Sequence, residues 1–151
     1  MMKVIEICTT DVVTATEDET LFRAAWLMRE HHVGDVVVTR EKEDRVMPVG
    51  ILTDRDFVTA MVAEGEDDFA ETTVGDAMTK VLIVARDDDD LDEVLNNMES
   101  NGVRRVPVID RNDSLVGVIS YDDIVTALAD RLHKLARITS AEIKREQQER
   151  P

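Results

Sequence analysis

Apolar residues recur along the chain with two different periods, and the same order of periods occurs twice. Spacing of three and four residues predicts amphipathic helices at 20–32, 54–64, 90–101 and from 121 onward. Runs rich in Val and Ile predict buried strands at 11–14, 35–39, 49–53, 81–85, 105–110 and 115–120. Each half of the chain therefore predicts a unit of the order β-α-β-β-α.

The two halves align residue by residue, as expected for a duplicated unit. Leu21 matches Leu91 and Met28 matches Met98 at an offset of 70, which falls to 67 where Gly50 meets Gly117. The offset changes within 40–48, which we expect to be a charged loop on the surface. We assign the first repeat to 5–65, a linker to 66–73, the second repeat to 74–130 and a helical tail to 131–151.

The tail keeps a helical stripe of aliphatic residues at Ile124, Leu128, Leu132, Leu135 and Ile138. Thr139 with Glu142 has the spacing of a helix start, so we expect a new helix there. Ile143 is the last aliphatic residue, and we expect the polar end of the chain to fray.

One motif closes each half: Gly50-Ile51-Leu52-Thr53-Asp54-Arg55-Asp56 and Gly117-Val118-Ile119-Ser120-Tyr121-Asp122-Asp123. A strand ends and a helix begins there, with a hydroxyl and a carboxylate three positions apart. The pair is close to a capping box, which satisfies amides of the first helical turn. It could also hold two neighbouring ribose hydroxyls, with a phosphate favoured at the helix N-terminus. The glycine indicates close approach of another backbone or of a ligand.

Composition excludes several classes of partner. The net charge of −15 argues against nucleic acid and anionic membrane surfaces, and an aromatic content of 3% argues against stacking on single strands. No apolar run approaches the length of a membrane span. Because Cys8 is the only cysteine, no internal disulfide can form, and we expect a reducing, cytoplasmic location.

No catalytic or metal-binding pattern is evident. The chain lacks a Ser/His/Asp triad, a Walker loop and zinc-ligand spacing. His31 and His32 are adjacent on a predicted helix and point about 100° apart, so they are poorly placed to share an ion. The acidic run 87–90 lacks the glycine and ligand spacing of a calcium loop, and is better explained as a helix start.

The doubled motif resembles that of a tandem pair of CBS domains, named from cystathionine β-synthase and called a Bateman module. Asn-Gly-Val-Arg-Arg-Val-Pro-Val-Ile-Asp at 101–110 and Gly-Asp-Ala-Met-Thr at 75–79 also resemble the family's segments, and the resemblance covers about 5–129. It implies an α+β (mixed α/β) fold of two β-α-β-β-α repeats packed about a pseudo-twofold axis, with a C-terminal helical tail. Two clefts would lie between the repeats.

In this family the clefts bind adenosine-containing ligands, and the module regulates a partner without catalysis. The resemblance therefore implies AMP, ADP, ATP or S-adenosylmethionine as regulatory ligands, no required cofactor, a homodimer, and a protein partner not named by the sequence. It places ribose-binding groups at Thr53 and Asp56 in one cleft and at Ser120 and Asp123 in the other. Apolar residues around the base would be Val12, Val13, Leu82 and Ile83, and phosphate-binding groups would be Arg104 and Arg105, with Arg55 in the turn beside Asp56.

The repeats differ in charge at matching positions. Gly34 and Asp35 stand where the second repeat has Arg104 and Arg105, and Asp122 stands opposite Arg55. We expect Arg55 and Arg105 to converge on one cleft, which would then favour a phosphorylated ligand. The alternatives are a structural or dimerisation module whose motif residues only cap helices, and an enzyme, for which no nucleophile with its base is evident.

Overall fold

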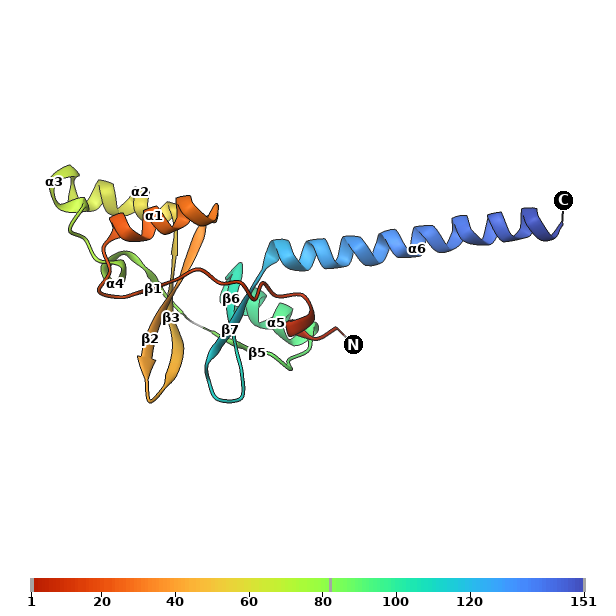
Figure 1. Ribbon diagram of the computed structural model, residues 1–151, viewed down its shortest axis with the longest axis horizontal. Helices are drawn as coiled ribbons and strands as arrows, with labels where there is room; N and C mark the ends of the chain where they lie inside the picture. Colours follow the sequence, from red (N-terminus) through yellow and green to blue (C-terminus); the bar gives the residue numbers. More distant parts are fainter. Residues whose placement is uncertain (1, 82, 151) are drawn as a thin grey trace.

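The computed structural model describes residues 2–81 and 83–150. Its first sheet has the order β1-β2-β3-β4 and its second sheet the order β5-β6-β7. The two sheets meet through β3 and β7, and a long helix extends away from them (Figure 1). The architecture is a mixed α/β pair of repeats with a long C-terminal helix, as predicted.

The helices and strands of each repeat follow the predicted order. The first repeat contains β1 (Thr14–Thr16), α1 (Leu21–His31), β2 (Asp35–Lys42), β3 (Arg45–Thr53) and α2 (Asp54–Glu64). The second contains β5 (Ala85–Arg86), α5 (Leu91–Asn101), β6 (Arg105–Ile109), β7 (Leu115–Ser120) and α6 (Tyr121–Glu149). Short elements precede and join them: the 3₁₀ turn η1 (Val4–Glu6), α3 (Glu66–Phe69), α4 (Val74–Ala77) and β4 (Thr79–Lys80).

Local chemistry explains where the first helix of each repeat begins and ends. The Thr20 hydroxyl accepts a hydrogen bond from the Arg23 amide at 3.2 Å, which caps α1. Both α1 and α5 end on a residue with left-handed backbone, His32 with φ 53° and Gly102 with φ 62°. The apolar stripe of each helix then faces its own sheet, where Leu21 and Leu91 are buried.

The segment that precedes the first strand of each repeat, which we call its lead-in, packs on the other repeat. It contains Val4 in the first repeat and Val74 in the second. Val4 is fully buried in the core of the second repeat, and Val74 is fully buried in the core of the first. Their amides make matching hydrogen bonds, from Val4 to the Asp89 carbonyl at 3.0 Å and from Val74 to the Glu19 carbonyl at 2.8 Å. In Figure 1 the N-terminal segment lies beside α5 before the chain crosses to β1.

The same exchange extends both sheets. Thr9 forms an antiparallel bridge with Val118 of β7, and Thr79 in β4 pairs with Ile51 of β3. The predicted strands at 11–14 and 81–85 were therefore placed too early: the regular strands are β1 and β5, which begin at Thr14 and Ala85. The residues before them connect a pairing partner in one sheet to a pairing partner in the other.

The prediction of a charged loop at 40–48 is wrong. β2 and β3 continue through this segment until Lys42 pairs with Arg45. Only Glu43 and Asp44 form the turn, with φ of 53° and 63°. Two consecutive left-handed residues match the twist of a two-residue hairpin, so the strands need no longer loop.

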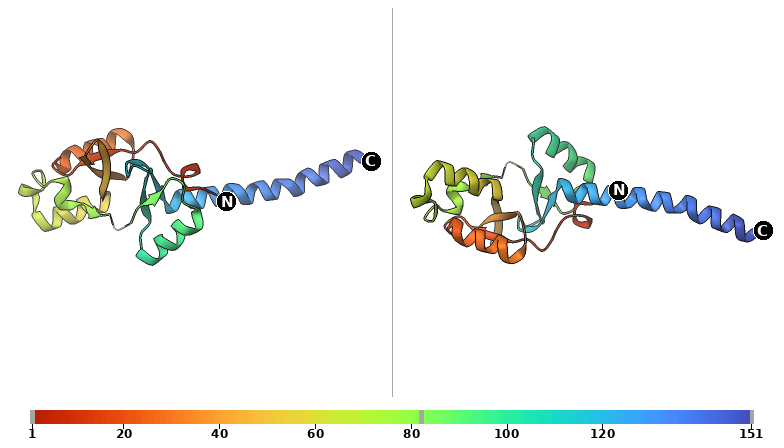
Figure 2. Two further views of the ribbon diagram at one scale, coloured as in Figure 1. Left: turned by 90° about the horizontal axis from the view of Figure 1, so that it is seen from below. Right: turned by 90° about the horizontal axis from the view of Figure 1, so that it is seen from above.

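The predictions of a new helix at Thr139 and of a frayed C-terminal end are also wrong. α6 runs without interruption from Tyr121 to Glu149 and projects away from both repeats in every view (Figures 1 and 2). The segment contains neither Gly nor Pro and is rich in Ala, Leu, Lys, Arg, Glu and Gln, which favour helix. Beyond Asp130 its described residues are all exposed.

Candidate functional site

The turn from β3 into α2 joins Thr53 to Asp56. The Thr53 amide donates to Oδ2 of Asp56 at 2.8 Å, and the Thr53 hydroxyl donates to the same oxygen at 3.2 Å. Both residues are half-buried. The carboxylate is thus fixed at the N-terminus of α2, where the helix dipole favours negative charge.

The turn from β7 into α6 repeats this geometry. The Ser120 amide donates to Oδ2 of Asp123 at 2.9 Å, and the Asp123 amide donates to the Ser120 hydroxyl at 3.1 Å. Capping is therefore one role of both hydroxyl–acid pairs. Across residues 2–81 and 83–150, no hydrogen bond involves Oδ1 of Asp56 or Asp123, so each carboxylate has an oxygen for a further donor.

One of these turns opens on a cleft of about 220 Å³ between the repeats. We call it the acidic cleft, because its charged residues are Asp11, Asp35 and Asp123 and it contains no base. The first repeat and the second repeat both supply walls, and the lining residues are Thr9, Asp11, Val12, Val13, Val33, Gly34, Asp35, Val118, Ser120 and Asp123. Val12 and Val13 therefore lie in the same cleft as Ser120 and Asp123.

A second cleft, of about 70 Å³, is lined mainly by residues that match those of the acidic cleft when the two repeats are aligned. We call it the basic cleft, because its charged residues are Lys80 and Arg105 and it contains no acid. Its lining residues are Ile51, Thr79, Lys80, Val81, Ile83, Val103, Arg105 and Pro107. Ile51, two residues before Thr53 on β3, lines this cleft as Val118 lines the acidic one, whereas Thr53 and Asp56 are not among its lining residues. Leu82, also expected here, lies outside the described residues.

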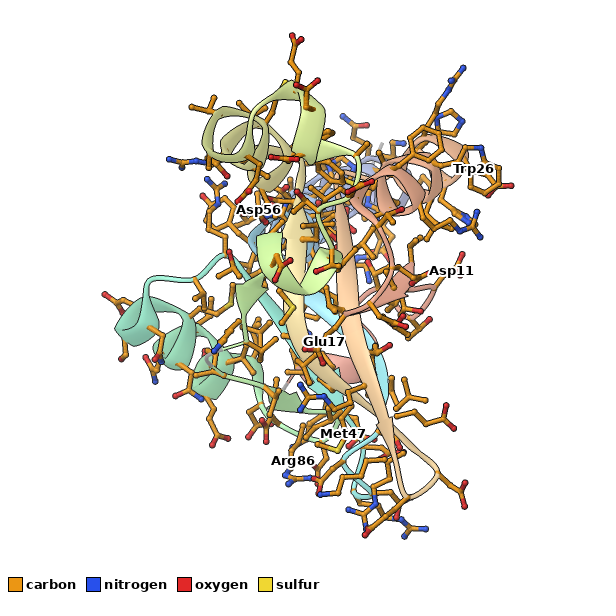
Figure 3. The ribbon with its side chains drawn as sticks, turned by 90° about the vertical axis from the view of Figure 1, so that its left-hand side faces the viewer. Asp11, Glu17, Trp26, Met47, Asp56 and Arg86 are labelled. Carbon is orange, nitrogen blue, oxygen red and sulfur yellow. The ribbon has the colours of Figure 1, made fainter. Side chains whose placement is uncertain are left out.

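The two motif turns face different sides of the molecule. In Figure 3, Asp56 and Asp11, the latter lining the acidic cleft, lie on opposite sides of β2 and β3. This separation is what a pseudo-twofold axis between the repeats requires. The acidic cleft takes its hydroxyl–acid turn from the second repeat and its apolar wall from the lead-in of the first. The basic cleft joins Ile51 of the first repeat to Val81 and Ile83 of the second.

Two of the three arginines expected to bind phosphate, Arg104 and Arg105, already have partners. Nε of Arg105 lies 2.5 Å from Oδ2 of Asp35, although its N–H is not aligned for a hydrogen bond. The Arg104 guanidinium lies over the Tyr121 ring at 5.0 Å from the centroid. Arg55 is exposed at the second position of α2, beside Asp56.

A larger hollow lies elsewhere and lacks the motif. It has a volume of about 600 Å³ and is lined by Glu17, Arg40, Pro48, Val49, Met78, Lys80, Val81, Ile83 and Val84. Arg40 and Glu17 neutralise one another at 2.7 Å. It is open and has no hydroxyl–acid turn, so we assign the site to the two smaller clefts.

Sequence reasoning missed Asp11 and Lys80 as cleft residues. A signal was available, because Asp11 aligns with Val81 and Lys80 aligns with Thr10 at the offset of 70. The charge differences at these two aligned positions add to the difference between Asp35 and Arg105. They make the clefts opposite in charge.

The described residues contain no group of three or more His, Cys, Asp or Glu side chains placed to hold a metal ion. None of the helices in the described part of the chain has the length and apolarity needed to cross a membrane.

Comparison with known proteins identifies the class to which this fold and pair of clefts belong. The sequence model of the CBS domain matches residues 4–63 and again 74–130. The chain therefore belongs to the CBS-domain family and is a tandem CBS pair, as the resemblance implied.

Particular relatives cover most of the chain. It is 35% identical over 120 residues to an uncharacterized protein of Methanopyrus kandleri, covering 80% of this chain and 59% of that protein. Hypoxic response protein 1 of Mycobacterium tuberculosis is 35% identical over 136 residues, which is 90% of each chain. A crystal structure of Hypoxic Response Protein I with two coordinated zinc ions matches with a TM-score of 0.68, covering 83% of this chain and 98% of that one.

A more distant structure shares the fold. The CBS domain pair of protein MJ0100, in complex with 5′-methylthioadenosine and S-adenosyl-L-methionine, matches with a TM-score of 0.72 at 24% identity. The match covers 87% of this chain and 98% of that pair.

Proposed function

We propose that this chain is a regulatory module that binds adenosine-containing ligands in the clefts between its two CBS repeats and transmits occupancy to a partner. The observation that carries this proposal is the doubled geometry of the clefts. Each hydroxyl–acid turn holds a carboxylate with a spare oxygen. Each cleft joins residues of both repeats, and Ser120 and Asp123 line the acidic one. Two vicinal ribose hydroxyls are donors suited to such an oxygen.

The ligand class is further supported by the fold relative, the MJ0100 pair, whose structure contains two adenosine compounds. AMP, ADP, ATP and S-adenosylmethionine are the candidates for this chain. Transmission between repeats is supported by the exchange of lead-in segments, because a ligand against residues 9–13 or 79–83 touches chain that belongs to both sheets.

A thermal-shift and calorimetry screen tests the proposal. Adenosine, AMP, ADP, ATP and S-adenosylmethionine are compared with uridine and UMP as matched controls. A ligand present at 100 times its dissociation constant adds about 2.7 kcal/mol of stability. Adenosine compounds should raise the melting temperature and pyrimidine nucleosides should not. Equal, negligible effects of all seven compounds would reject ligand sensing.

The alternative is a structural or dimerisation module without a nucleotide ligand. It is favoured by capping, which already occupies both hydroxyl–acid pairs. Native mass spectrometry of protein purified without added nucleotide separates the two functions, because it reports bound ligand and subunit number together.

We also propose that the chain forms a homodimer. Large apolar side chains are exposed on α1, α2 and α6: Phe22 (71%), Trp26 (45%), Val58 (64%), Val62 (83%), Leu132 (67%), Leu135 (61%) and Ile138 (63%). Patches of this kind mark interaction surfaces. A second subunit would cover them.

A further inference from the structure

Asp35 and Arg105 are the same position of the two repeats, and they meet each other. Asp35 begins β2 and Arg105 begins β6. Their side chains approach to 2.5 Å and are 29% and 36% exposed, with Nε of Arg105 buried. With identical repeats this contact would join two like charges, so the exchange of acid and base turns a repulsive contact into an attractive one.

The pair also separates the two clefts. Arg105 lines the basic cleft, and Asp35 lines the acidic cleft. One of the two positive charges that the basic cleft offers to an anion, that of Arg105, is therefore the same charge that neutralises a carboxylate of the acidic cleft. A ligand in one cleft that draws Asp35 and Arg105 apart therefore also changes the electrostatic potential in the other cleft.

We propose that the Asp35–Arg105 pair determines the ligand charge that each cleft accepts and couples the two clefts. The inference rests on the proposed binding of adenosine compounds. A phosphate held in the basic cleft competes with Asp35 for the Arg105 guanidinium. Asp35 then presents an uncompensated charge to the acidic cleft, beside Asp11 and Asp123.

The coupling has a definite sign. An anionic ligand in the basic cleft weakens binding of a second anion in the acidic cleft and strengthens binding of a cationic ligand there. S-adenosylmethionine, with its sulfonium charge, is such a ligand, and adenosine is the neutral reference. Because coupling between two binding sites is reciprocal, the cationic ligand must strengthen AMP binding by the same factor.

The first experiment measures ligand charge preference by calorimetry with AMP and adenosine. It uses Asp123→Ala as background, so that ligand is confined to the basic cleft. Asp35→Asn should strengthen AMP binding about tenfold, which is about 1.4 kcal/mol, and leave adenosine binding unchanged. Arg105→Gln should remove the preference for AMP. Asp67→Asn, the same change on exposed α3, is the matched control and should alter neither ligand.

The second experiment measures coupling in the chain with Asp123 intact. Saturation with AMP should strengthen S-adenosylmethionine binding at least fivefold, within the usual range of coupling. Saturation with adenosine should not, and the coupling should vanish in Asp35→Asn. The double exchange Asp35→Arg with Arg105→Asp retains an ion pair, which protects the fold, and should abolish the AMP preference of the basic cleft.

The outcomes are distinguishable. If adenosine binds but Asp35→Asn leaves the ratio of AMP to adenosine affinity within twofold, the charge inference is wrong and ligand sensing stands. If AMP saturation leaves S-adenosylmethionine affinity unchanged, the coupling is wrong. If no adenosine compound binds the unaltered chain, the proposed function fails and this inference fails with it.

Discussion

The carbonyl oxygen of Thr9 occupies the space into which a side chain at Gly117 would project. A Cβ built on Gly117 would lie 2.8 Å from that oxygen and 2.9 Å from Sγ of Cys8. Thr9 and Val118 exchange two backbone hydrogen bonds of 2.9 Å at the same place. The glycine of the motif is thus explained by a crossing backbone, one of the two reasons that the sequence suggested.

Gly117→Ala should therefore destabilise the fold by about 1–3 kcal/mol, as overpacking of a tight contact does. Gly50→Ala should cost less, because its Cβ would meet the flexible Met78 side chain first and the Thr79 carbonyl at 3.1 Å. Gly34→Ala is the control, since nothing lies within 4 Å of its Cβ. Urea unfolding measures the three variants. Equal stability of Gly117→Ala and Gly34→Ala would contradict the contact.

Asp56→Ala and Asp123→Ala should each lose a helix cap worth about 1 kcal/mol. Each should also remove ligand from one cleft, and the double variant should bind no adenosine compound. Because the clefts differ in charge, Asp56→Ala should act mainly on AMP and Asp123→Ala mainly on uncharged or cationic ligands. Calorimetry on variants with confirmed helical content checks this. Full affinity in the folded double variant would leave capping as the only role of both acids.

Leu132→Asp should weaken or abolish the proposed dimer if α6 contributes to it. Val125, Leu128, Leu132 and Leu135 follow a spacing of three and four residues on α6, as in the seam of a helix pair. His133→Asp introduces the same charge one residue away and off this seam, so it should leave the subunit number unchanged. Sedimentation at low and high salt measures both. An unaltered chain that is monomeric in both would refute dimer formation.

Cys8 should react slowly with alkylating reagents. Burial raises the pKa of its thiol above the ordinary value, so less thiolate is present at a given pH. The alkylation rate of Cys8 is followed by mass spectrometry as a function of pH. The pH at which this rate rises should be higher in the folded protein than in the urea-unfolded protein. Since the unfolded chain ionises first, this thiol's contribution to stability is present below the ordinary pKa and is lost as pH rises through the raised one. A profile identical to that of the unfolded protein would exclude burial.

The sequence predicted the repeat and its helices because duplicated periodicity survives in local residue types. Leu21 and Leu91, or Thr20 and Asp90, sit at the same places in both halves. It predicted the clefts only through the family resemblance, since no local pattern states which segments meet. The sequence does not predict that each lead-in packs on the other repeat, because an apolar residue such as Val4 or Val74 carries no signal for which of the two cores it joins.

Charge was the feature least accessible from sequence. The acid–base exchange at Asp35 and Arg105 was visible, but their mutual contact was not, because it depends on where the pseudo-twofold axis passes. The hairpin at Glu43–Asp44 differs from the predicted loop because charged residues on an exposed strand resemble those of a loop. α6 continues through Thr139 because the residues on both sides favour helix, and the capping spacing of Thr139 with Glu142 does not outweigh that propensity.

The bridge between Thr9 and Val118 also sets an order of events during synthesis. Thr9 leaves the ribosome before its partner strand, which is made roughly 100 residues later, and at about 5–20 residues per second this is a delay of about 5–20 s. Throughout that interval Val4 has no core to enter. Val4 and Thr9 can thus dock only after the second repeat has been made, although they precede it in the chain.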